Sequence, residues 1–221
     1  MSTDEPAKPK LRKDAQRNVE KLTAAAIELF SERGLDCPLD EIARRAGVSH
    51  GTLYSRFGTR EALIDAVVPQ LAADQLEAAI QHAEAGTDPW DRFARYVEKI
   101  SALMAGDPAL SDAVTRRYAD TPRLSAVCEE SFDRGREYVR AAHDVGVLRP
   151  DFAPEDFLLL FSASAALART TEHTAPEAWR RGLAFTLDGL RAAAAHPLPV
   201  GPLSPEQALA AMHRGASPSR V

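Results

Sequence analysis

Residues 39–57 have the sequence LDEIARRAGVSHGTLYSRF. In its first half, apolar side chains recur at i, i+3, i+4 and i+7, which places them on one stripe of a short helix with charged residues outside. These apolar residues are Leu39, Ile42, Ala43 and Ala46. Gly47 follows and can adopt the left-handed backbone that ends a helix. The pattern predicts a two-turn amphipathic helix that stops at residue 47.

A second helix is expected to start at once, because Ser49 can cap its N-terminus. Leu53 and Phe57 are spaced i, i+4 and would face inward. The other side is small and polar, and consists of His50, Gly51, Thr52, Ser55 and Arg56, with Tyr54 at its edge. Two helices joined by a tight turn form a helix-turn-helix, whose second helix enters the DNA major groove. Taken alone, the pattern also fits an ordinary short helical hairpin.

The flanking sequence carries a family resemblance. AAAIELFSERG at 24–34, DEIARRA at 40–46 and GVSHGTLYSRFGTREALIDAV at 47–67 together resemble the DNA-binding domain of the TetR family of bacterial transcriptional regulators. The resemblance covers about residues 17 to 68. It implies base contacts from His50, Gly51, Thr52, Ser55 and Arg56, and phosphate contacts from Tyr54 and Arg60. The resemblance further implies that Arg17 and Lys21, on the first helix, lie near the DNA backbone.

The chain has 221 residues and a net charge of −5, which by itself argues against a nucleic-acid partner. The charge is unevenly distributed, however. Residues 1–60 carry a net charge of +2 and the remainder carries −7. This asymmetry is compatible with one DNA-facing end and an acidic body.

Several other classes of protein find no support in the sequence. Cys37 and Cys128 lie far apart, and no histidine cluster or HExxH motif occurs, so no disulfide framework, metal or other cofactor is expected. No nucleotide-binding or nucleophile motif is present, so the protein is not expected to be an enzyme. No apolar run suggests a signal peptide or membrane span. The expectation is a cytoplasmic protein, associated with the nucleoid through DNA.

Four segments are predicted. Residues 1–13 form a disordered arm, which either only adds solubility or contacts DNA through its lysines and arginine. Residues 14–58 form the helix-turn-helix domain, with Asp36 or Cys37 capping its second helix. Residues 59–195 form a helical effector-binding and dimerisation domain, and residues 196–221 a Pro-rich tail with a possible short helix at 204–213. The fold class is therefore all-α, an N-terminal three-helix domain followed by a helical bundle.

The body is expected to hold a small-molecule pocket, because family members usually have one and helical ligand sites are apolar with a few polar groups. The candidate lining residues are Phe93, Tyr96, Val97, Ile100, Met104, Tyr118, Phe132, Arg136 and Phe161. The alternative is that this aromatic stripe is ordinary core.

The last two long helices, near 156–170 and 176–195, are expected to pair across a dimer, as is common in the family. The ending RRGLAFTLDGLRA looks like an actinobacterial branch typified by SbtR-like regulators. Small side chains would permit close packing across a symmetric interface or within the subunit. The candidate interface residues are Phe157, Phe161, Ser164, Ala168, Trp179, Leu183, Leu187 and Leu190.

The sequence thus predicts a homodimeric repressor that holds a palindromic operator and is released by a small-molecule effector. The alternative is a helical small-molecule or protein-binding module that has lost DNA binding. The two differ in whether the protein shifts its own upstream DNA.

Overall fold

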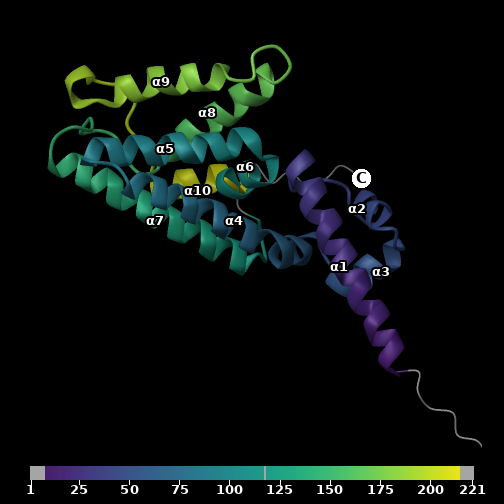
Figure 1. Cartoon of the computed structure of the whole chain (residues 1–221). Coiled ribbons are helices and arrows are strands. Elements are labelled where there is room, and N and C mark those ends of the chain that lie inside the picture. The colour runs from purple at the N-terminus through teal and green to yellow at the C-terminus, as the bar shows by residue number, and fades with distance from the viewer. Residues whose placement is uncertain (1–7, 117, 215–221) are drawn as a thin grey trace, which may run out of the picture.

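The computed structural model describes residues 8–116 and 118–214, and within them the chain is helical (Figure 1). Its α-helices are α1 (Lys8–Arg33), α2 (Leu39–Ala46), α3 (His50–Phe57), α4 (Arg60–Glu84), α5 (Pro89–Gly106), α6 (Pro108–Thr115), α7 (Pro122–Asp144), α8 (Asp156–Thr171), α9 (Ala178–Leu190) and α10 (Pro205–Arg214). A short 3-10 helix spans Ala192–Ala194. In place of strands, these residues show one isolated β-bridge, between Leu148 and Arg191. The all-α prediction is confirmed.

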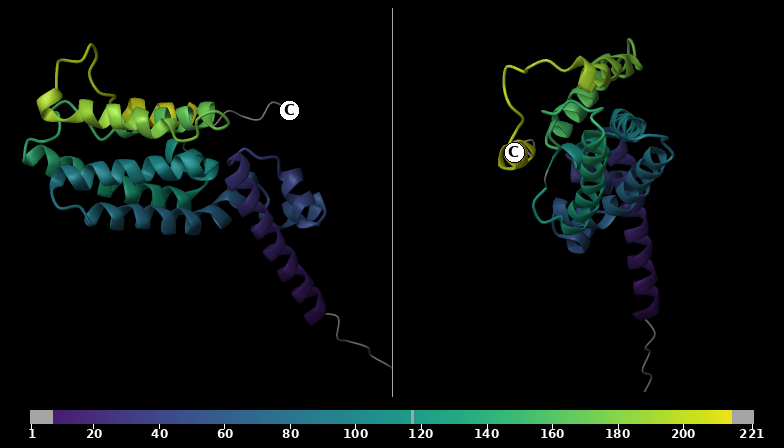
Figure 2. Two further views of the ribbon diagram at one scale, coloured as in Figure 1. Left: turned by 45° about the horizontal axis from the view of Figure 1, so that its top comes forward. Right: turned by 90° about the vertical axis from the view of Figure 1, so that its left-hand side faces the viewer.

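The helices form two packed groups that meet along α4 and α6. Helices α1 to α3 lie at one end, while α4, α5 and α7 run side by side in the body, with α8 and α9 along one side (Figures 1 and 2). The first core includes α1–α3, the first half of α4 and the inner face of α6. The second core joins the remaining part of α4 to α5, α7, α8 and α9. Packing is therefore shared across the predicted boundary at residues 58 and 59.

The predicted arm and the observed first helix differ. The sequence assigned residues 1–13 to an arm, but α1 already begins at Lys8 and projects away from the domain (Figure 1). Residues 1–7 lie outside the described part. The run from Lys8 to Lys13 can be helical because its proline lies in the first turn, where the missing N–H costs no intrahelical hydrogen bond.

The turns of the first domain follow the sequence closely. Gly47 has φ 66°, in the left-handed region, and ends α2. Ser49 caps α3 by accepting a hydrogen bond from the Thr52 N–H at 3.2 Å, and Thr59 caps α4 through the Ala62 N–H at 3.1 Å. The cap by Ser49 was predicted.

The predicted cap of α2 was wrong. Neither Asp36 nor Cys37 caps the helix, because Pro38 occupies the N-cap position without a side-chain hydrogen bond. Asp36 instead pairs with Arg116 of the body at 2.6 Å, and Cys37 is buried. The carboxylate thus has a stronger, charged partner elsewhere.

Candidate nucleic-acid interface and apolar cavity

Helix α3 presents a polar outer face. Leu53 is buried at 1% exposure and anchors the helix against α1 and α2, whereas Tyr54 is 42% exposed. His50, Gly51, Ser55 and Arg56 are exposed as well, and Thr52 is half-buried, with its hydroxyl 2.8 Å from that of Ser49. The predicted recognition surface is therefore solvent-facing, apart from the inward side that Leu53 and Phe57 provide.

The N-terminal turn of α3 is held to α2 by a pair of side chains. His50 Nδ1 pairs with the carboxylate of Asp40, and its ring stacks on Tyr54 with centroids 4.3 Å apart. These contacts fix the orientation of two residues that the sequence predicted near DNA. The contribution of Asp40 was not predicted, since it lies on the exposed side of α2 with nothing to mark it.

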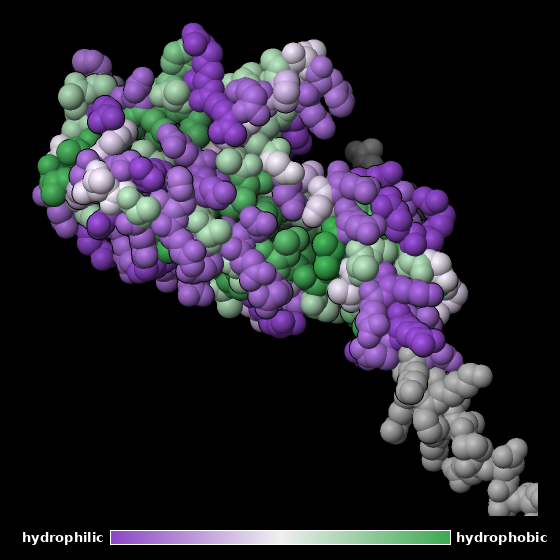
Figure 3. All heavy atoms as spheres, viewed as in Figure 1, coloured by the Kyte–Doolittle hydropathy of each residue, from purple (hydrophilic) through white to green (hydrophobic). Residues whose placement is uncertain are grey.

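A groove runs between α3 and the N-terminal half of α1. Its α3 side consists of Ser49, Gly51, Thr52, Ser55 and Arg56, and its α1 side consists of Ala15, Gln16, Asn18, Val19 and Leu22. Figure 3 shows that the surface over this end of the molecule is mostly hydrophilic, with hydrophobic residues where it meets the body. The groove has a mixed lining, and its polar members, such as Asn18, Ser55 and Arg56, suit contacts to a hydrated, polyanionic partner.

The charges of this domain are divided into two sets. The arginines of α2 are neutralised locally, since Arg45 contacts Glu32 at 3.1 Å and Arg44 contacts Glu41 at 3.1 Å. In contrast, among the side chains of residues 14–116 and 118–213, Arg17, Lys21 and Arg56 form no ion pair or hydrogen bond. These exposed cations lie on α1 and α3, the two walls of the predicted interface.

Arg60 has a different environment from the one expected of a phosphate ligand. Its Nη1 donates to the carbonyl oxygens of Leu35 at 3.0 Å and Cys37 at 2.5 Å. The guanidinium thereby ties the start of α4 to the loop between α1 and α2. This contact explains a cation at a helix N-terminus without DNA, although the predicted phosphate contact itself stays a prediction.

The body encloses an apolar cavity of about 280 Å³ between α4, α5, α6, α7 and α8. Five of the nine predicted residues line it: Tyr96, Ile100, Phe132, Arg136 and Phe161. The other four, Phe93, Val97, Met104 and Tyr118, are buried in the cores and do not reach the cavity. The packing of those four agrees with the ordinary-core alternative.

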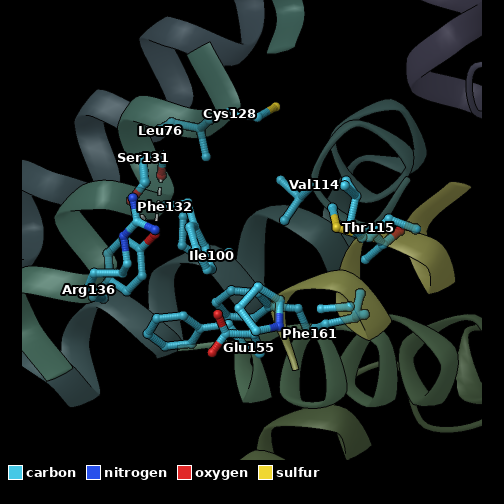
Figure 4. A pocket seen from close by; sticks show the side chains of 17 residues that line it. Leu76, Ile100, Val114, Thr115, Cys128, Ser131, Phe132, Arg136, Glu155 and Phe161 are labelled. Carbon is cyan, nitrogen blue, oxygen red and sulfur yellow. Dashed lines mark hydrogen bonds between the residues drawn. The ribbon is translucent and has the colours of Figure 1, made fainter. Parts of the chain in front are cut away.

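The remaining walls of the cavity were not predicted. Figure 4 shows Leu76, Val114, Thr115, Cys128, Ser131 and Glu155 around the same space as Ile100, Phe132 and Phe161. Tyr96 donates a hydrogen bond to the carbonyl oxygen of Ser131 at 2.8 Å, and burial raises its pKa to about 12. Four further lining residues come from α10: Pro205, Ala208, Leu209 and Met212. The helical spacing of these four residues could have shown that they share one face of α10. It could not have shown that this face packs against the cavity.

The predicted dimer residues are all buried inside the subunit. Each of the eight has at most 8% exposure, because these side chains hold α8 and α9 to each other and to α5. This burial leaves them little surface for a second subunit, and their role in a dimer stays a prediction. The large apolar side chains that α8 and α9 expose are Leu159 at 55% and Phe185 at 61%.

Two family models match the chain. Residues 22–67 match bacterial regulatory proteins of the tetR family, and residues 88–192 match the C-terminal domain of SbtR-like transcriptional regulators. The chain belongs to the TetR family. The two matched segments together cover more than half of this regulator, and the resemblance predicted from its motifs is confirmed.

Individual relatives agree with this assignment. YvdT of Bacillus subtilis, an uncharacterized HTH-type transcriptional regulator, is 34% identical over 79 residues, which are 35% of this regulator and 41% of YvdT. The HTH-type transcriptional repressor Rv3405c of Mycobacterium tuberculosis is 33% identical over 111 residues, which are 42% of this regulator and 57% of Rv3405c. The regulator therefore spans about half of the length of these curated relatives.

A solved structure, RolR in complex with the ligand resorcinol, has the same fold as this regulator. The TM-score is 0.54 at 21% identity, over 85% of this regulator and 98% of RolR.

In the described part of the regulator, no helix combines the length and apolar character needed to cross a membrane. The same residues contain no cluster of three or more His, Cys, Asp or Glu side chains suited to a metal ion.

Proposed function

We propose that this regulator is a homodimeric repressor in the cytoplasm, which holds a palindromic operator and releases it when a small, largely apolar molecule binds in the body. The observation that carries the proposal is the exposed polar face of α3, flanked by the unpaired cations Arg17, Lys21 and Arg56. Unpaired cations on an exposed surface are available to phosphates, and release of DNA counterions favours their binding.

Within this proposal, α3 lies in the major groove. His50, Gly51, Thr52, Ser55 and Arg56 are placed near base edges, and Tyr54 is placed on the phosphate backbone. Arg56 is the residue best suited to specificity, since a guanidinium can donate two hydrogen bonds to guanine O6 and N7. Arg17 and Lys21 on α1 then contact phosphates across the groove between α1 and α3.

The dimer requires a surface other than the buried residues predicted from sequence. We place it on the outer faces of α8 and α9, where Leu159 and Phe185 are exposed together with small residues such as Ala163 and Ala166. Covering an exposed phenylalanine with a second copy of the chain is favourable, because it removes apolar surface from water. A twofold dimer would present two copies of α3 to half-sites about one helical turn, or roughly 34–36 Å, apart.

The effector would occupy the cavity, whose walls are mostly apolar and aromatic. A volume of about 280 Å³ suits a small molecule, and RolR, which shares the fold, was crystallised with resorcinol, a small aromatic compound. Arg136 and Glu155, also in the lining, could orient a polar group. We therefore propose a small aromatic or apolar effector.

The signal can reach the DNA through α6, which touches both sites. Val114 and Thr115 of α6 line the cavity, while Asp112 of the same helix binds the backbone of Leu35 next to α2. Helix α4, which runs from the first domain into the body, is held to α7 in a similar way. Its Asp65 accepts hydrogen bonds from the N–H groups of Arg123 and Leu124 at the start of α7. A ligand that shifts α6 or α4 would shift α3 with them.

The proposal is tested by fluorescence anisotropy with labelled duplexes from the DNA upstream of the regulator's own gene. We expect one duplex to bind more tightly than a scrambled duplex of the same composition, with a stoichiometry of two chains. Equal affinity for all duplexes, or none for any, would instead identify a helical binding module without operator recognition.

A further inference from the structure

The structure points to a built-in cover for the cavity: we propose that α10 closes over the cavity mouth and must swing away before a ligand enters or leaves. The proposal rests on the proposed role of the cavity as a ligand site. The cover itself lies beyond residue 192, where the match to the SbtR-like domain ends.

One stripe of α10 forms part of the cavity wall. Pro205, Ala208, Leu209 and Met212 follow i, i+3, i+4 and i+7 and all line the cavity. Ala208 is 9% exposed, whereas Glu206, Gln207, Ala210 and Ala211 on the other sides are exposed. The helix is therefore amphipathic, and its apolar side is the one directed at the cavity.

The helix is connected so that it can move as a unit. Arg149 donates to the carbonyl oxygen of His196 at 2.9 Å, which fixes the chain at the end of the body. Residues 197–203 then lead away and back to α10, with Leu198 55% and Val200 76% exposed (Figure 2). Seven residues can span roughly 23 Å when extended. This exposed segment is the hinge of the cover.

The helix also stabilises its own N-terminus. Ser204 Oγ accepts a hydrogen bond from the Gln207 N–H at 3.2 Å, and Gln207 Oε1 accepts one from the Ser204 N–H at 2.9 Å. This reciprocal arrangement is a capping box, which supports a helix independently of its surroundings. The cap lets α10 stay helical when it leaves the body, although so short a helix is only marginally stable alone.

The helix covers the cavity and does not fill it. With α10 in place the cavity still has a volume of about 280 Å³, and Leu209 remains 45% exposed at its rim. A segment that competed with the ligand would occupy this space. In the closed state α10 therefore adds a wall to the ligand site, and opening it controls the rate of exchange.

Cys128 provides a probe that needs neither effector nor DNA, since it lines the cavity. The rate at which N-ethylmaleimide alkylates Cys128 is measured in the full chain by peptide mass spectrometry. Cys37 is an internal reference, because it is buried in the first domain, and burial, with a contribution from Glu41, raises its thiol pKa. A variant that changes the alkylation rate of Cys128 alone acts at the cavity. A variant that changes the alkylation rates of both cysteines has disturbed the fold.

Ala208→Glu places a carboxylate against the apolar wall, and Ala211→Glu adds the same group on the exposed side of the same helix. We expect Ala208→Glu, and a chain ending after Leu203, to raise the Cys128 rate about tenfold or more with the Cys37 rate unchanged. Ala211→Glu should match the parent protein. Equal Cys128 rates in all four proteins would overturn the proposal, and so would an equal increase in both alanine variants. Loss of operator binding would bear on the proposed function alone.

Discussion

The carboxylate of Asp112 accepts a 2.8 Å hydrogen bond from the backbone N–H of Leu35, which lies 77 positions earlier in the chain. The bond joins the body to the loop before α2. It is reinforced by Arg116, which contacts both Asp112 at 3.3 Å and Asp36 at 2.6 Å. Gly34 permits the approach: it has φ 82°, and a Cβ there would meet Asp112 Oδ2 at 2.4 Å. These contacts thus join the loop before α2 to α6, whose Val114 and Thr115 line the cavity.

Asp112→Ala should lower the free energy of unfolding by about 1–3 kcal/mol, because the Leu35 N–H loses its partner in a largely buried position. Asp112→Asn keeps an oxygen acceptor and removes the buried negative charge, whose desolvation raises the pKa of this carboxyl, so its loss of stability should be smaller. Urea denaturation measures both. Asp188→Ala, at an exposed position, is the control, and an equal loss there would show that the connection contributes nothing.

Arg56→Ala should weaken binding to the cognate operator by about 1–3 kcal/mol if the guanidinium contacts a base. The penalty should shrink for operators already altered at the contacted base pair. Anisotropy titrations with operators that each differ by a single base pair provide this measurement. Arg140→Ala, at an exposed position of α7, is the matched control. A uniform loss across all variants would move Arg56 to the phosphate contacts.

Arg60→Ala should act mainly on stability. It removes a charged donor from the carbonyl oxygens of Leu35 and Cys37, which costs about 1–3 kcal/mol of unfolding free energy. The slope of operator affinity against salt concentration should stay as in the parent protein if Arg60 keeps these carbonyl partners in the DNA complex. A slope reduced by about one unit would restore Arg60 to the phosphate-binding set that the family resemblance implies.

Phe185→Glu should convert the dimer to monomer, since a carboxylate cannot be covered by the apolar face of a second copy. Light scattering coupled to gel filtration gives the mass directly. Ala78→Glu adds the same charge at an exposed position of α4, away from α8 and α9, and should leave the mass unchanged. A dimeric Phe185→Glu protein would place the interface elsewhere.

Stability should fall as the pH rises from 10 to 12, in part through Tyr96. The unfolded tyrosine ionises near pH 10, whereas the buried one, with a pKa of about 12, keeps its proton, so the unfolded state is favoured in this window. The two-unit difference corresponds to a loss of about 2–3 kcal/mol. Tyr96→Phe should show a shallower decline of the free energy of unfolding in urea titrations between pH 10 and 12. An unchanged slope would contradict the assignment.

The sequence predicted the short-range features of the fold well. Periodicity and capping residues placed α2 and α3, and Ser49 and Gly47 behave as predicted because each acts within a few residues of its own position. Long-range partners could not be predicted in this way. Asp36 offered the same local signal as a capping residue, but Arg116, 80 positions away, binds it.

The same limit applies to the residues predicted in the body. An apolar stripe shows which side of a helix is buried, but not whether a cavity, the core or a second subunit covers it. Phe93 and Ile100 share one stripe of α5, yet only Ile100 reaches the cavity. Trp179 and Leu183 were assigned to a dimer surface because they lie on the apolar stripe of a helix that commonly pairs across the dimer in the family, and here they pack within the subunit.

The position of α10 has an evolutionary and practical consequence. Four of the side chains around the cavity belong to α10, which lies beyond the segment that matches the SbtR-like domain, so insertions, deletions or exchanges there leave helices α1 to α3 intact. Grafting tails from related proteins would then retune inducer selectivity and response time independently of promoter choice. Such an exchange is a convenient starting point for building biosensors.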